Sequence, residues 1–317
     1  MGTESAGTTV EWVDIDEGHE GQRVDNFLLT HLKGVPRSHI YRILKTGEVR
    51  RNGGRIKPQD RLLTGDRLRI PPVRRSEAAE PASAPSRHWQ SEIDRRILHE
   101  DDDLLVLNKP AGLAVHGGSG IRLGVIETLR LMRPEARFLE LVHRLDRDTS
   151  GCLLIAKKRS ALRALHEQFR DDDINKGYLA LLAGRWARRS FLVDAPLRKN
   201  TLKSGERLVC VARDGKEAQT QFRRLRAFDG ATLVEARPVT GRTHQIRVHA
   251  LAMGHPLVGD ERYGSAETNR IFKDLGLKRL FLHASEAGFC HPRTGEPLTV
   301  EAPLDAALAK LLEVLAQ

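Results

Sequence analysis

Residues 143–151 concentrate several side chains that could do chemistry. They have the sequence His-Arg-Leu-Asp-Arg-Asp-Thr-Ser-Gly and lie between two apolar segments. A polar loop between two buried strands holds its side chains rigidly. Asp146 lies close to Arg144 and Arg147, and nearby cations keep a carboxylate ionised, as a nucleophile requires. The pattern therefore indicates Asp146 as a candidate nucleophile.

The same residues also fit a purely structural interpretation. Asp146 or Asp148 could accept hydrogen bonds from local backbone amides in a turn, and spacing alone does not separate the two. The role of Tyr178 also has two interpretations. It is either a buried aromatic on a strand or a surface on which a nucleic-acid base stacks.

A second group of chemically useful side chains lies on a predicted helix over residues 243–253. His244 and Arg247 share one face of this helix, and the apolar residues on another face are Ile246, Ala250 and Met253. The helix follows Gly241 directly, so its positive N-terminal end could face a phosphate group.

Metal and thiol chemistry are disfavoured by the spacing of their usual ligands. His244 and His249 are five residues apart, which is the wrong interval for one helix face, and the sequence contains neither HExxH nor CxxC. The three cysteines lie far apart and fit no disulfide framework. We therefore expect no metal site and a reducing, cytoplasmic location. We expect no membrane segment either, because the chain has no apolar run of about 18 residues or more.

Positive charge is concentrated near the start of the chain. The net charge is +10, and residues 21–75 hold 14 Lys or Arg against four acids, a surplus as large as that of the whole chain. Such a block attracts phosphate polyanions, although a solvated basic face would have the same composition. Helical spacing between Val24 and Gly47 and a turn signal at 52–54 predict two helices followed by a small hairpin. The candidate RNA-binding residues are Arg37, Arg42, Lys45, Arg50, Arg55 and Lys57.

Composition divides the chain into four parts. Residues 1–20 form an acidic N-terminal extension, 21–75 form the basic module, 76–89 have the Ala, Ser and Pro content of a linker, and 90–317 form a large domain. In the large domain, strands at irregular spacing with few helices favour an α+β fold, with a mixed, mainly antiparallel β-sheet and peripheral helices. The predicted strands are 104–107, 139–142, 152–156, 178–182, 219–224, 232–236, 280–283 and 298–301, and the predicted helices are 160–170 and 243–253.

Several motifs of the large domain resemble those of a known family, the pseudouridine synthases that act on ribosomal and transfer RNA. The family signature is His-Arg-Leu-Asp-x-x-Thr-Ser-Gly, and residues 143–151 match it. Further matches follow the family's order, at 107–112, 176–180, 240–249 and 254–260.

Two more likenesses refine this resemblance. Residues 21–72 resemble the S-four type of RNA-binding module, first seen in a small-subunit ribosomal protein, and many family members carry such a module before the catalytic domain. Segments 115–120 and 133–138 are most similar to those of members that modify the large ribosomal subunit.

The resemblance implies an isomerase that converts selected uridines of large-subunit (23S) ribosomal RNA to pseudouridine. It implies that Asp146 is the nucleophile and that Arg247 pairs with it. Tyr178 would lie against the flipped-out base and help with the proton removed from C5, and Arg144 would fill the gap left in the RNA. The implied substrate-binding residues also include His143, Thr149 and His244. No electrons or phosphates are exchanged, so neither a metal nor an organic cofactor is expected.

Three alternatives remain beside this hypothesis. The substrate could be transfer RNA, or the chain could be a non-catalytic ribosome-assembly protein that keeps the fold. It could also be a metal-dependent hydrolase that acts on nucleic acid through Asp146 and Asp148. A non-catalytic protein would be expected to have lost Asp146, Tyr178 or Arg247, and a hydrolase to have a larger carboxylate cluster. We therefore expect a monomeric RNA-modifying enzyme.

Overall fold

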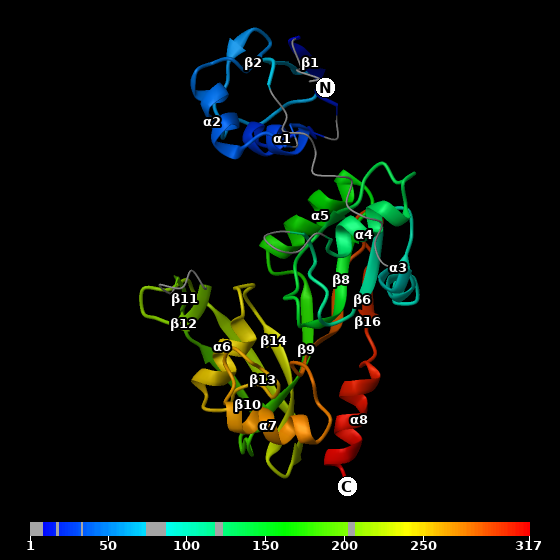
Figure 1. The fold of residues 1–317 in the computed structure, drawn as a ribbon, viewed down its shortest axis with the longest axis vertical. Coiled ribbons are helices and arrows are strands. Elements are labelled where there is room, and N and C mark those ends of the chain that lie inside the picture. Colours follow the sequence, from blue (N-terminus) through cyan, green and yellow to red (C-terminus); the bar gives the residue numbers. More distant parts are fainter. Residues whose placement is uncertain (1–8, 17–18, 33, 74–86, 118–122, 202–206) are drawn as a thin grey trace, which may run out of the picture. The chain divides into compact units, whose positions relative to one another are not determined.

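The chain forms two compact units, residues 1–84 and 85–317, which are described separately (Figure 1). The structure is a computed structural model, and it describes residues 9–16, 19–32, 34–73, 87–117, 123–201 and 207–317. Within these ranges no helix has the length and apolar character needed to cross a membrane.

The N-terminal unit is a small α+β domain. Its two helices are α1 (Val24–His31) and α2 (Arg37–Lys45). Its four-stranded sheet has the order β1-β4-β2-β3 and consists of β1 (Glu11–Asp14), β2 (Arg50–Arg51), β3 (Gly54–Arg55) and β4 (Arg67–Ile70). Asn52 and Gly53 have φ angles of 51° and 82° in the turn between β2 and β3, which is the left-handed backbone that a two-residue hairpin requires. The two helices and the hairpin expected from the sequence are thus present.

Strand β1 differs from the sequence analysis, which assigned residues 1–20 to an acidic extension. Residues Glu11–Asp14 instead pair with β4 in antiparallel register, and Ile15 is buried in the core of the unit. The acidic composition of the segment concealed a short strand whose side chains alternate between exposed and half-buried positions.

The C-terminal unit is built on a ten-stranded sheet in the order β10-β13-β14-β9-β15-β8-β6-β5, with β16 added beside β15 and β7 beside β8. Strands β8 and β15 pair in parallel, and the other pairs of this sheet are antiparallel. This confirms the predicted mixed, mainly antiparallel α+β fold. The strands are β5 (Ile97–Glu100), β6 (Leu104–Lys109), β7 (Glu140–Leu141), β8 (Ser150–Ala156), β9 (Asn175–Ala183), β10 (Ser190–Asp194), β13 (Gln219–Phe228), β14 (Ala231–Pro238), β15 (Leu282–Cys290) and β16 (Pro297–Glu301).

Helices cover both faces of this sheet, and a separate hairpin projects from it. The hairpin consists of β11 (Leu197–Thr201) and β12 (Arg207–Val211). The helices are α3 (Arg87–Asp94), α4 (Val125–Met132), α5 (Arg159–Arg170), α6 (Gln245–Ala252), α7 (Ala266–Asp274) and α8 (Ala306–Leu315). Most of the predicted linker over 76–89 lies outside the described residues, but α3 already begins at Arg87.

Each half of the sheet packs against helices on both of its faces and so has its own hydrophobic cores. In the half formed by β6 and β8, alternate side chains point to opposite faces. Leu105 and Leu153 pack with α4, whereas Val106 and Leu154 pack with α5. In the other half, β9 and β14 pack against α6 on one face and against α7 and α8 on the opposite face. Strand β9 links the two halves (Figure 1).

Three neighbouring strands meet at one row of residues beside residues 143–149, the loop before β8 that we call the motif loop. Ala284 on β15 pairs with Gly151 on β8 on one side and with Tyr178 on β9 on the other. Gly151 has a φ of 108°, and a Cβ atom there would lie 2.1 Å from the carbonyl oxygen of Ala284. The glycine therefore permits the close approach of β8 and β15 that places the motif loop near Tyr178.

Replacing this glycine should destabilise the C-terminal unit. We expect Gly151→Ala to lower the free energy of unfolding by about 2–5 kcal/mol, because it combines an unfavourable φ with a backbone clash. Gly230 is a matched control, since its φ is 71° but a Cβ there meets nothing within 4 Å. Gly230→Ala should cost only about 1–2 kcal/mol. Urea denaturation of both variants measures the difference, and equal losses would contradict the close approach.

Candidate active site

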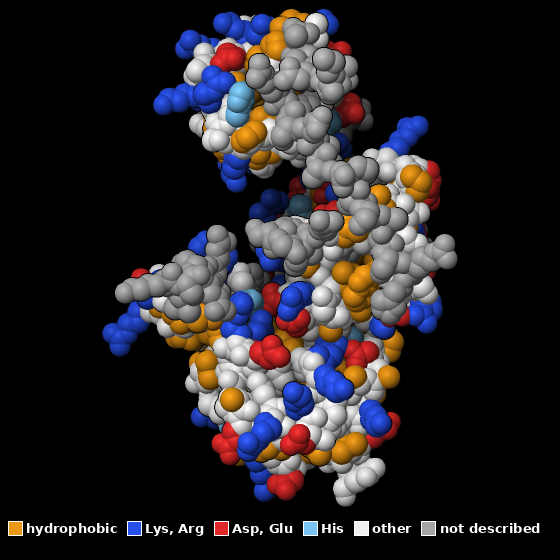
Figure 2. Space-filling view, viewed as in Figure 1, with side chains coloured by type: hydrophobic (Ala, Val, Ile, Leu, Met, Phe, Trp, Pro, Cys, Tyr) orange, Lys and Arg blue, Asp and Glu red, His pale blue; other side chains and the backbone are white. Residues whose placement is uncertain are grey.

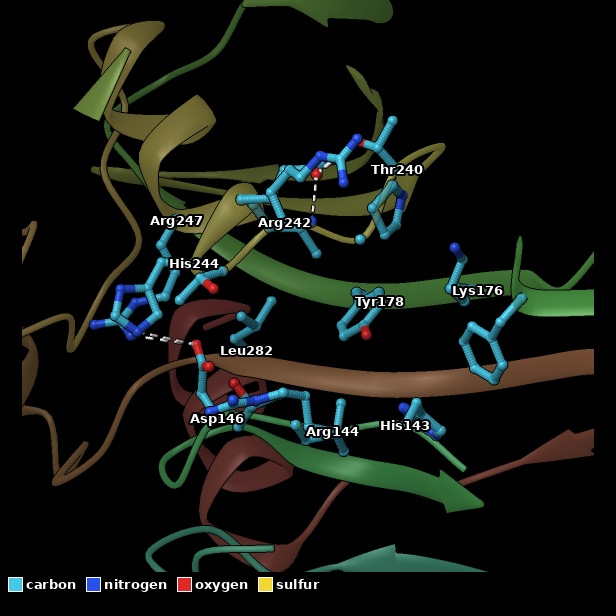
Figure 3. A pocket seen from close by; sticks show the side chains of 18 of the residues that line it. His143, Arg144, Asp146, Lys176, Tyr178, Thr240, Arg242, His244, Arg247 and Leu282 are labelled. Carbon is cyan, nitrogen blue, oxygen red and sulfur yellow. Dashed lines mark hydrogen bonds and ion pairs between the residues drawn. The ribbon is translucent and has the colours of Figure 1, made fainter. Parts of the chain in front are cut away.

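A pocket of about 500 Å³ opens where the two halves of the sheet meet (Figure 3). The motif loop before β8, strand β9, the segment after β14 and the start of α6 supply its walls. It brings together all seven catalytic and substrate-binding residues predicted in the C-terminal unit, namely His143, Arg144, Asp146, Thr149, Tyr178, His244 and Arg247. These residues come from three segments that are far apart in the sequence, so the fold assembles the site.

Arg247 lies between two carboxylates. Its Nε and Nη2 atoms each donate a hydrogen bond of 2.7 Å to Asp260, and its Nη1 atom lies 3.5 Å from Oδ2 of Asp146. The side chain of Asp260 is 0% exposed, whereas that of Asp146 is 23% exposed. The buried carboxylate therefore holds the guanidinium, and the guanidinium faces the accessible carboxylate.

Both partners of the buried pair stay charged. Burial alone would raise the pKa of Asp260, but hydrogen bonds from Arg247 and from the N–H groups of Tyr263 and Arg262 outweigh it and lower the pKa. Burial likewise opposes the charge of Arg247, but the hydrogen bonds to Asp260 and the charges of Asp260 and Asp146 raise its pKa. Asp146 thus faces a permanent positive charge.

His244 is the second neighbour of Asp146 whose side chain can donate a hydrogen bond. Its Nε2 atom lies 3.7 Å from Oδ2 of Asp146 (Figure 3). It occupies the N-cap position of α6 with φ 54° and ψ 20°, a left-handed conformation that is uncommon for a residue with a side chain. The buried amide of Gln245 stabilises this turn, since it accepts hydrogen bonds from Thr240 and from the N–H of Arg242.

Tyr178 lies on β9 in the wall of the pocket, and Leu282 lies between it and Asp146 in Figure 3. Burial and then the negative charge of Asp146 raise the pKa of the Tyr178 phenol. The phenol is therefore neutral, and its ring and Leu282 give the pocket an apolar side opposite its charged one.

His143 and Thr149 lie at the two ends of the motif loop. The Nε2 atom of His143 accepts a 3.1 Å hydrogen bond from the N–H of Leu154, and burial lowers its pKa to about 4. The ring is therefore neutral and anchors the loop to β8. Thr149 is 2% exposed, and its hydroxyl has no hydrogen-bond partner among the described residues. Thr149 lines the pocket, but its hydroxyl oxygen is buried inside the wall.

A buried lysine holds the motif loop in place. Lys109 is 0% exposed, and its ammonium group donates to three backbone carbonyls, those of Pro110, Leu113 and Arg147. Burial lowers its pKa to about 7. Through these bonds Lys109 ties the segment after β6 to the loop that carries Asp146.

A second hollow of about 1010 Å³ meets the first at Asp146. Both hollows are lined by Arg144, Asp146, His244 and Arg247. The second hollow adds further basic side chains, which are Arg147, Arg262, Lys278 and Arg279. Asp146 is therefore reached from two connected spaces, and Lys and Arg side chains line both.

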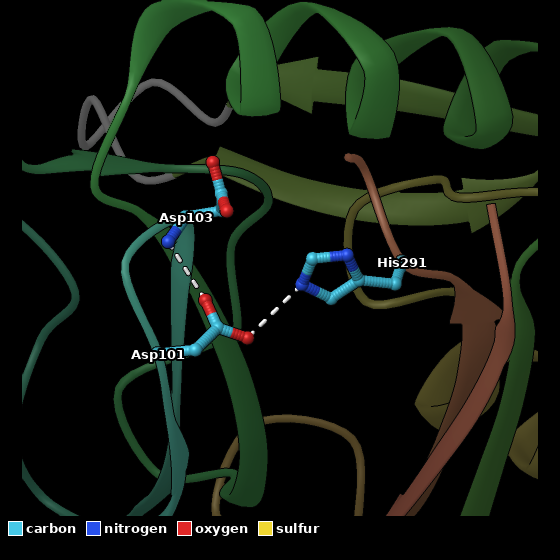
Figure 4. A group of neighbouring side chains, drawn as sticks. All are labelled: Asp101, Asp103 and His291. Carbon is cyan, nitrogen blue, oxygen red and sulfur yellow. Dashed lines mark hydrogen bonds and ion pairs between the residues drawn. The ribbon is translucent and has the colours of Figure 1, made fainter. Parts of the chain in front are cut away.

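A cluster of Asp101, Asp103 and His291 lies away from this pocket, between the β5–β6 turn and the end of β15 (Figure 4). Its carboxylates already have partners within the protein. Asp103 pairs with Arg293 at 2.6 Å and with Lys158 at 3.1 Å, and Asp101 accepts from His291, His99 and two backbone N–H groups. These contacts explain the cluster as a structural network that joins two turns.

The six predicted RNA-binding residues lie in the N-terminal unit. All six are exposed, namely Arg37, Arg42, Lys45, Arg50, Arg55 and Lys57. Figure 2 shows Lys and Arg side chains spread over the visible surface of this unit. They come from α2, the β2–β3 hairpin and the residues after it, and they make this part of the domain's surface basic.

The sequence analysis did not identify Asp260 and Tyr263, two residues that hold side chains of the pocket in position. Both belong to the turn after Leu257, and neither lines the pocket that contains Tyr178. Asp260 is the last residue of the motif at 254–260, and this position could have identified it as a site residue. Tyr263 lies three residues after that motif, and no other feature of the sequence points to it.

The sequence matches two family models. Residues 103–252 match the model described as RNA pseudouridylate synthase, and residues 22–68 match the S4 domain. The ribosomal large subunit pseudouridine synthase C of Salmonella typhimurium is 56% identical over 317 residues, and that of Escherichia coli is 55% identical. Each comparison covers 99% of both chains.

Solved structures give the same result. The structure of human RNA pseudouridylate synthase domain containing 4 has a TM-score of 0.60 and 28% sequence identity, and the match covers 72% of this chain and 96% of the human one. Human RNA pseudouridylate synthase domain containing 1 has a TM-score of 0.56 and 27% identity over 70% of this chain and 94% of its own.

Removing the buried carboxylate that holds Arg247 should cost stability. We expect Asp260→Asn to lower the free energy of unfolding at pH 7 by about 3–5 kcal/mol, because a buried guanidinium loses its charged partner. The folded-state pKa of Asp260 is lowered. Its contribution is therefore present above the ordinary carboxyl range near pH 4 and is lost as the pH falls below it. Urea denaturation from pH 7 to pH 3 should show the two proteins converging.

The control for this experiment is Asp214→Asn. It breaks an ion pair with Arg198 in which both side chains are more than half exposed, so it should change stability little at any pH. A loss as large as that of Asp260→Asn would contradict the special role of the buried pair.

Proposed function

The chain belongs to the RNA pseudouridylate synthase family, and we propose that its pocket converts selected uridines of large-subunit (23S) ribosomal RNA to pseudouridine, with Asp146 as the nucleophile. The observation that carries the assignment of Asp146 is its position. It is the carboxylate of the pocket that lies beside Arg247, which a buried carboxylate holds in place, and the same pocket contains Tyr178.

The reaction makes specific demands on the pocket. The bond from N1 of uracil to C1′ of the ribose breaks, the base turns, and a bond from C5 to C1′ forms. The C5 proton leaves, and N1 gains a proton. Whether Asp146 attacks C1′ or assists loss of the uracil, its carboxylate must be charged and aimed at C1′. Arg247 at 3.5 Å supports both requirements.

Tyr178 is proposed to hold the base and to assist the proton transfer at C5. Its phenol enters the reaction neutral, partly because the charge of Asp146 raises its pKa. The C5 proton leaves after the C5–C1′ bond has formed, when any ester between Asp146 and C1′ has broken and the carboxylate is free again. The neutral phenol can hold the base beside that carboxylate, but it cannot itself accept the proton.

The target nucleotide has to leave its base stack to enter the pocket. Extrusion of a base costs a few kcal/mol, which binding has to supply. Arg144 is exposed at the boundary between the two hollows, and we propose that it fills the space that the nucleotide leaves. With the uracil beside Tyr178 and the ribose at Asp146, the basic side chains of the second hollow, such as Arg147 and Lys278, could contact the neighbouring phosphates.

The substrate class follows from the relatives and from the N-terminal unit. The relatives at 55–56% identity are named for the large ribosomal subunit, and the S4 domain supplies a basic surface. We propose that this surface docks on a folded part of the same RNA. Action as a monomer, without metal or cofactor, and a cytoplasmic location stay predictions from the sequence.

The first test replaces the nucleophile. Asp146→Asn should reduce pseudouridine formation by about 10⁴-fold or more, because an amide cannot act as the anionic nucleophile, while RNA affinity changes little. Chemical mapping of pseudouridine in 23S ribosomal RNA and filter binding measure the two quantities. Appreciable modification by this variant would overturn the mechanism.

Two controls accompany this test. Asp148→Asn removes the neighbouring carboxylate and should cause a far smaller loss, whereas a hydrolase using both carboxylates would be disabled by either change. Activity that survives a chelator such as EDTA would separate the isomerase from a hydrolase that needs a divalent metal.

The second test concerns the basic surface of the N-terminal unit. Changing Lys45, Arg55 and Lys57 together to Gln should weaken RNA binding and reduce the slope of log affinity against log salt concentration by about 2–3, because each phosphate contact contributes close to one unit. The matched control changes three exposed cations of α7 and α8 to Gln, namely Arg270, Lys273 and Lys310. Equal slopes for wild type and the first variant would refute the role of this surface.

A further inference from the structure

Tyr263 contacts both residues that face Asp146. Its hydroxyl lies 2.8 Å from Nδ1 of His244, and the guanidinium carbon of Arg247 lies 5.0 Å from the centre of its ring. Tyr263 is 8% exposed and lines neither of the two hollows that meet at Asp146. It therefore acts on the site through other side chains.

We propose that Tyr263 is a positioning residue that fixes the tautomer of His244, so that the imidazole donates a hydrogen from Nε2 toward the nucleophile Asp146. The inference rests on the proposed function only for the identity of the nucleophile. The tautomer itself follows from the hydrogen bonds around the phenol and can be tested without any RNA.

The direction of these hydrogen bonds is set by a backbone amide. The N–H of Val209 on β12 lies 3.0 Å from the Tyr263 oxygen, and an amide N–H can only donate. The phenol oxygen therefore accepts from Val209, and among the described residues Nδ1 of His244 is the acceptor within hydrogen-bond distance of the phenol's own hydrogen. A neutral imidazole that accepts at Nδ1 carries its hydrogen on Nε2.

The tautomer matters because His244 is neutral near pH 7. Burial is the largest influence on its pKa and lowers it. Two carboxylates, Asp146 and Asp260, favour the charged form, while Arg247 and Arg262 oppose it. In the other neutral tautomer, a lone pair on Nε2 would face the carboxylate of Asp146 at 3.7 Å, which is repulsive. The phenol excludes that arrangement.

The same residue connects the nucleophile to the β11–β12 hairpin. Tyr263 packs in a small cluster with Leu197 and Val209 of the hairpin and with Val248 of α6. The bond from Val209 thus completes a chain from the hairpin through the phenol and the imidazole to Asp146. The orientation of the carboxylate depends on this chain as well as on Arg247.

Tyr263→Phe isolates the hydroxyl, because it keeps the ring beneath Arg247. We expect kcat for pseudouridine formation at pH 8 to fall about tenfold, as is usual for loss of a hydrogen bond near a charged group, with KM for RNA unchanged. The loss should shrink as the pH is lowered through the pKa of His244, which lies below the ordinary imidazole value, because imidazolium carries hydrogens on both nitrogens and no longer needs the phenol. A loss that stays constant while the ring, followed by NMR, becomes protonated would overturn the proposal.

A measurement that does not use activity tests the tautomer directly. In protein labelled with ¹⁵N-histidine, the ring nitrogens of His244 should show the Nε2–H form in the wild type and a shift toward the Nδ1–H form in Tyr263→Phe. An Nδ1–H form in the wild type would overturn the inference. This result stands apart from the proposed function, whose failure would appear as activity of Asp146→Asn.

A double-mutant cycle separates positioning from general destabilisation. If Tyr263 acts through His244, then Tyr263→Phe should cause no further loss of kcat in a His244→Gln background. Leu308→Ala, in the buried face of α8, serves as the stability control, because it removes core packing without contact to the pocket. Additive losses in the cycle, or a pH-dependent kcat defect in Leu308→Ala, would count against the proposal.

Discussion

The pocket depends on one buried guanidinium shared unequally between two carboxylates. Asp260 binds Arg247 through two short hydrogen bonds and is fully buried, whereas Asp146 stands at 3.5 Å and is partly open to solvent. The arginine would keep its position and its charge even if Asp146 moved toward a substrate, because its stronger partner lies behind it. A nucleophile can then be mobile while the charge that activates it stays fixed.

The sheet explains how residues 101 positions apart come to face each other. The motif loop enters β8, β8 runs parallel to β15, and β15 pairs with β9, which carries Tyr178. Gly151 allows the close contact between β8 and β15, and Lys109 holds the loop from the opposite side. The remaining contributor, α6, follows β14 in the other half of the sheet, and its first turn is held by Gln245.

The sequence predicted the residues that line the pocket better than the residues that position them. Asp146, Tyr178 and Arg247 stood in motifs that resemble those of a known family, and the resemblance implied their roles, whereas spacing alone left Asp146 and Tyr178 open. Tyr263 acts through a backbone amide of β12 and the face of a guanidinium, and neither contact leaves a pattern in the sequence.

The secondary-structure prediction also succeeded only where the local sequence pattern was strong. The most buried strands, such as β6 and β8, were found, whereas the helices α3, α4, α7 and α8 and the strands β5, β10, β11 and β12 were missed. The four helices have only eight to ten residues, so their periodicity is weak over so short a span. Helix α6 was predicted two residues too early, because the left-handed backbone of His244 delays its start.

The division of the sheet into two halves with separate cores limits how this enzyme can be altered. Asp146 belongs to the half packed by α4 and α5, and Arg247 belongs to the half packed by α6. Repacking either core could leave each half well folded and yet shift one set of reacting groups against the other by a fraction of an ångström. Variants selected for heat resistance alone would therefore drift toward stable but slow enzymes, unless catalysis were selected at the same time.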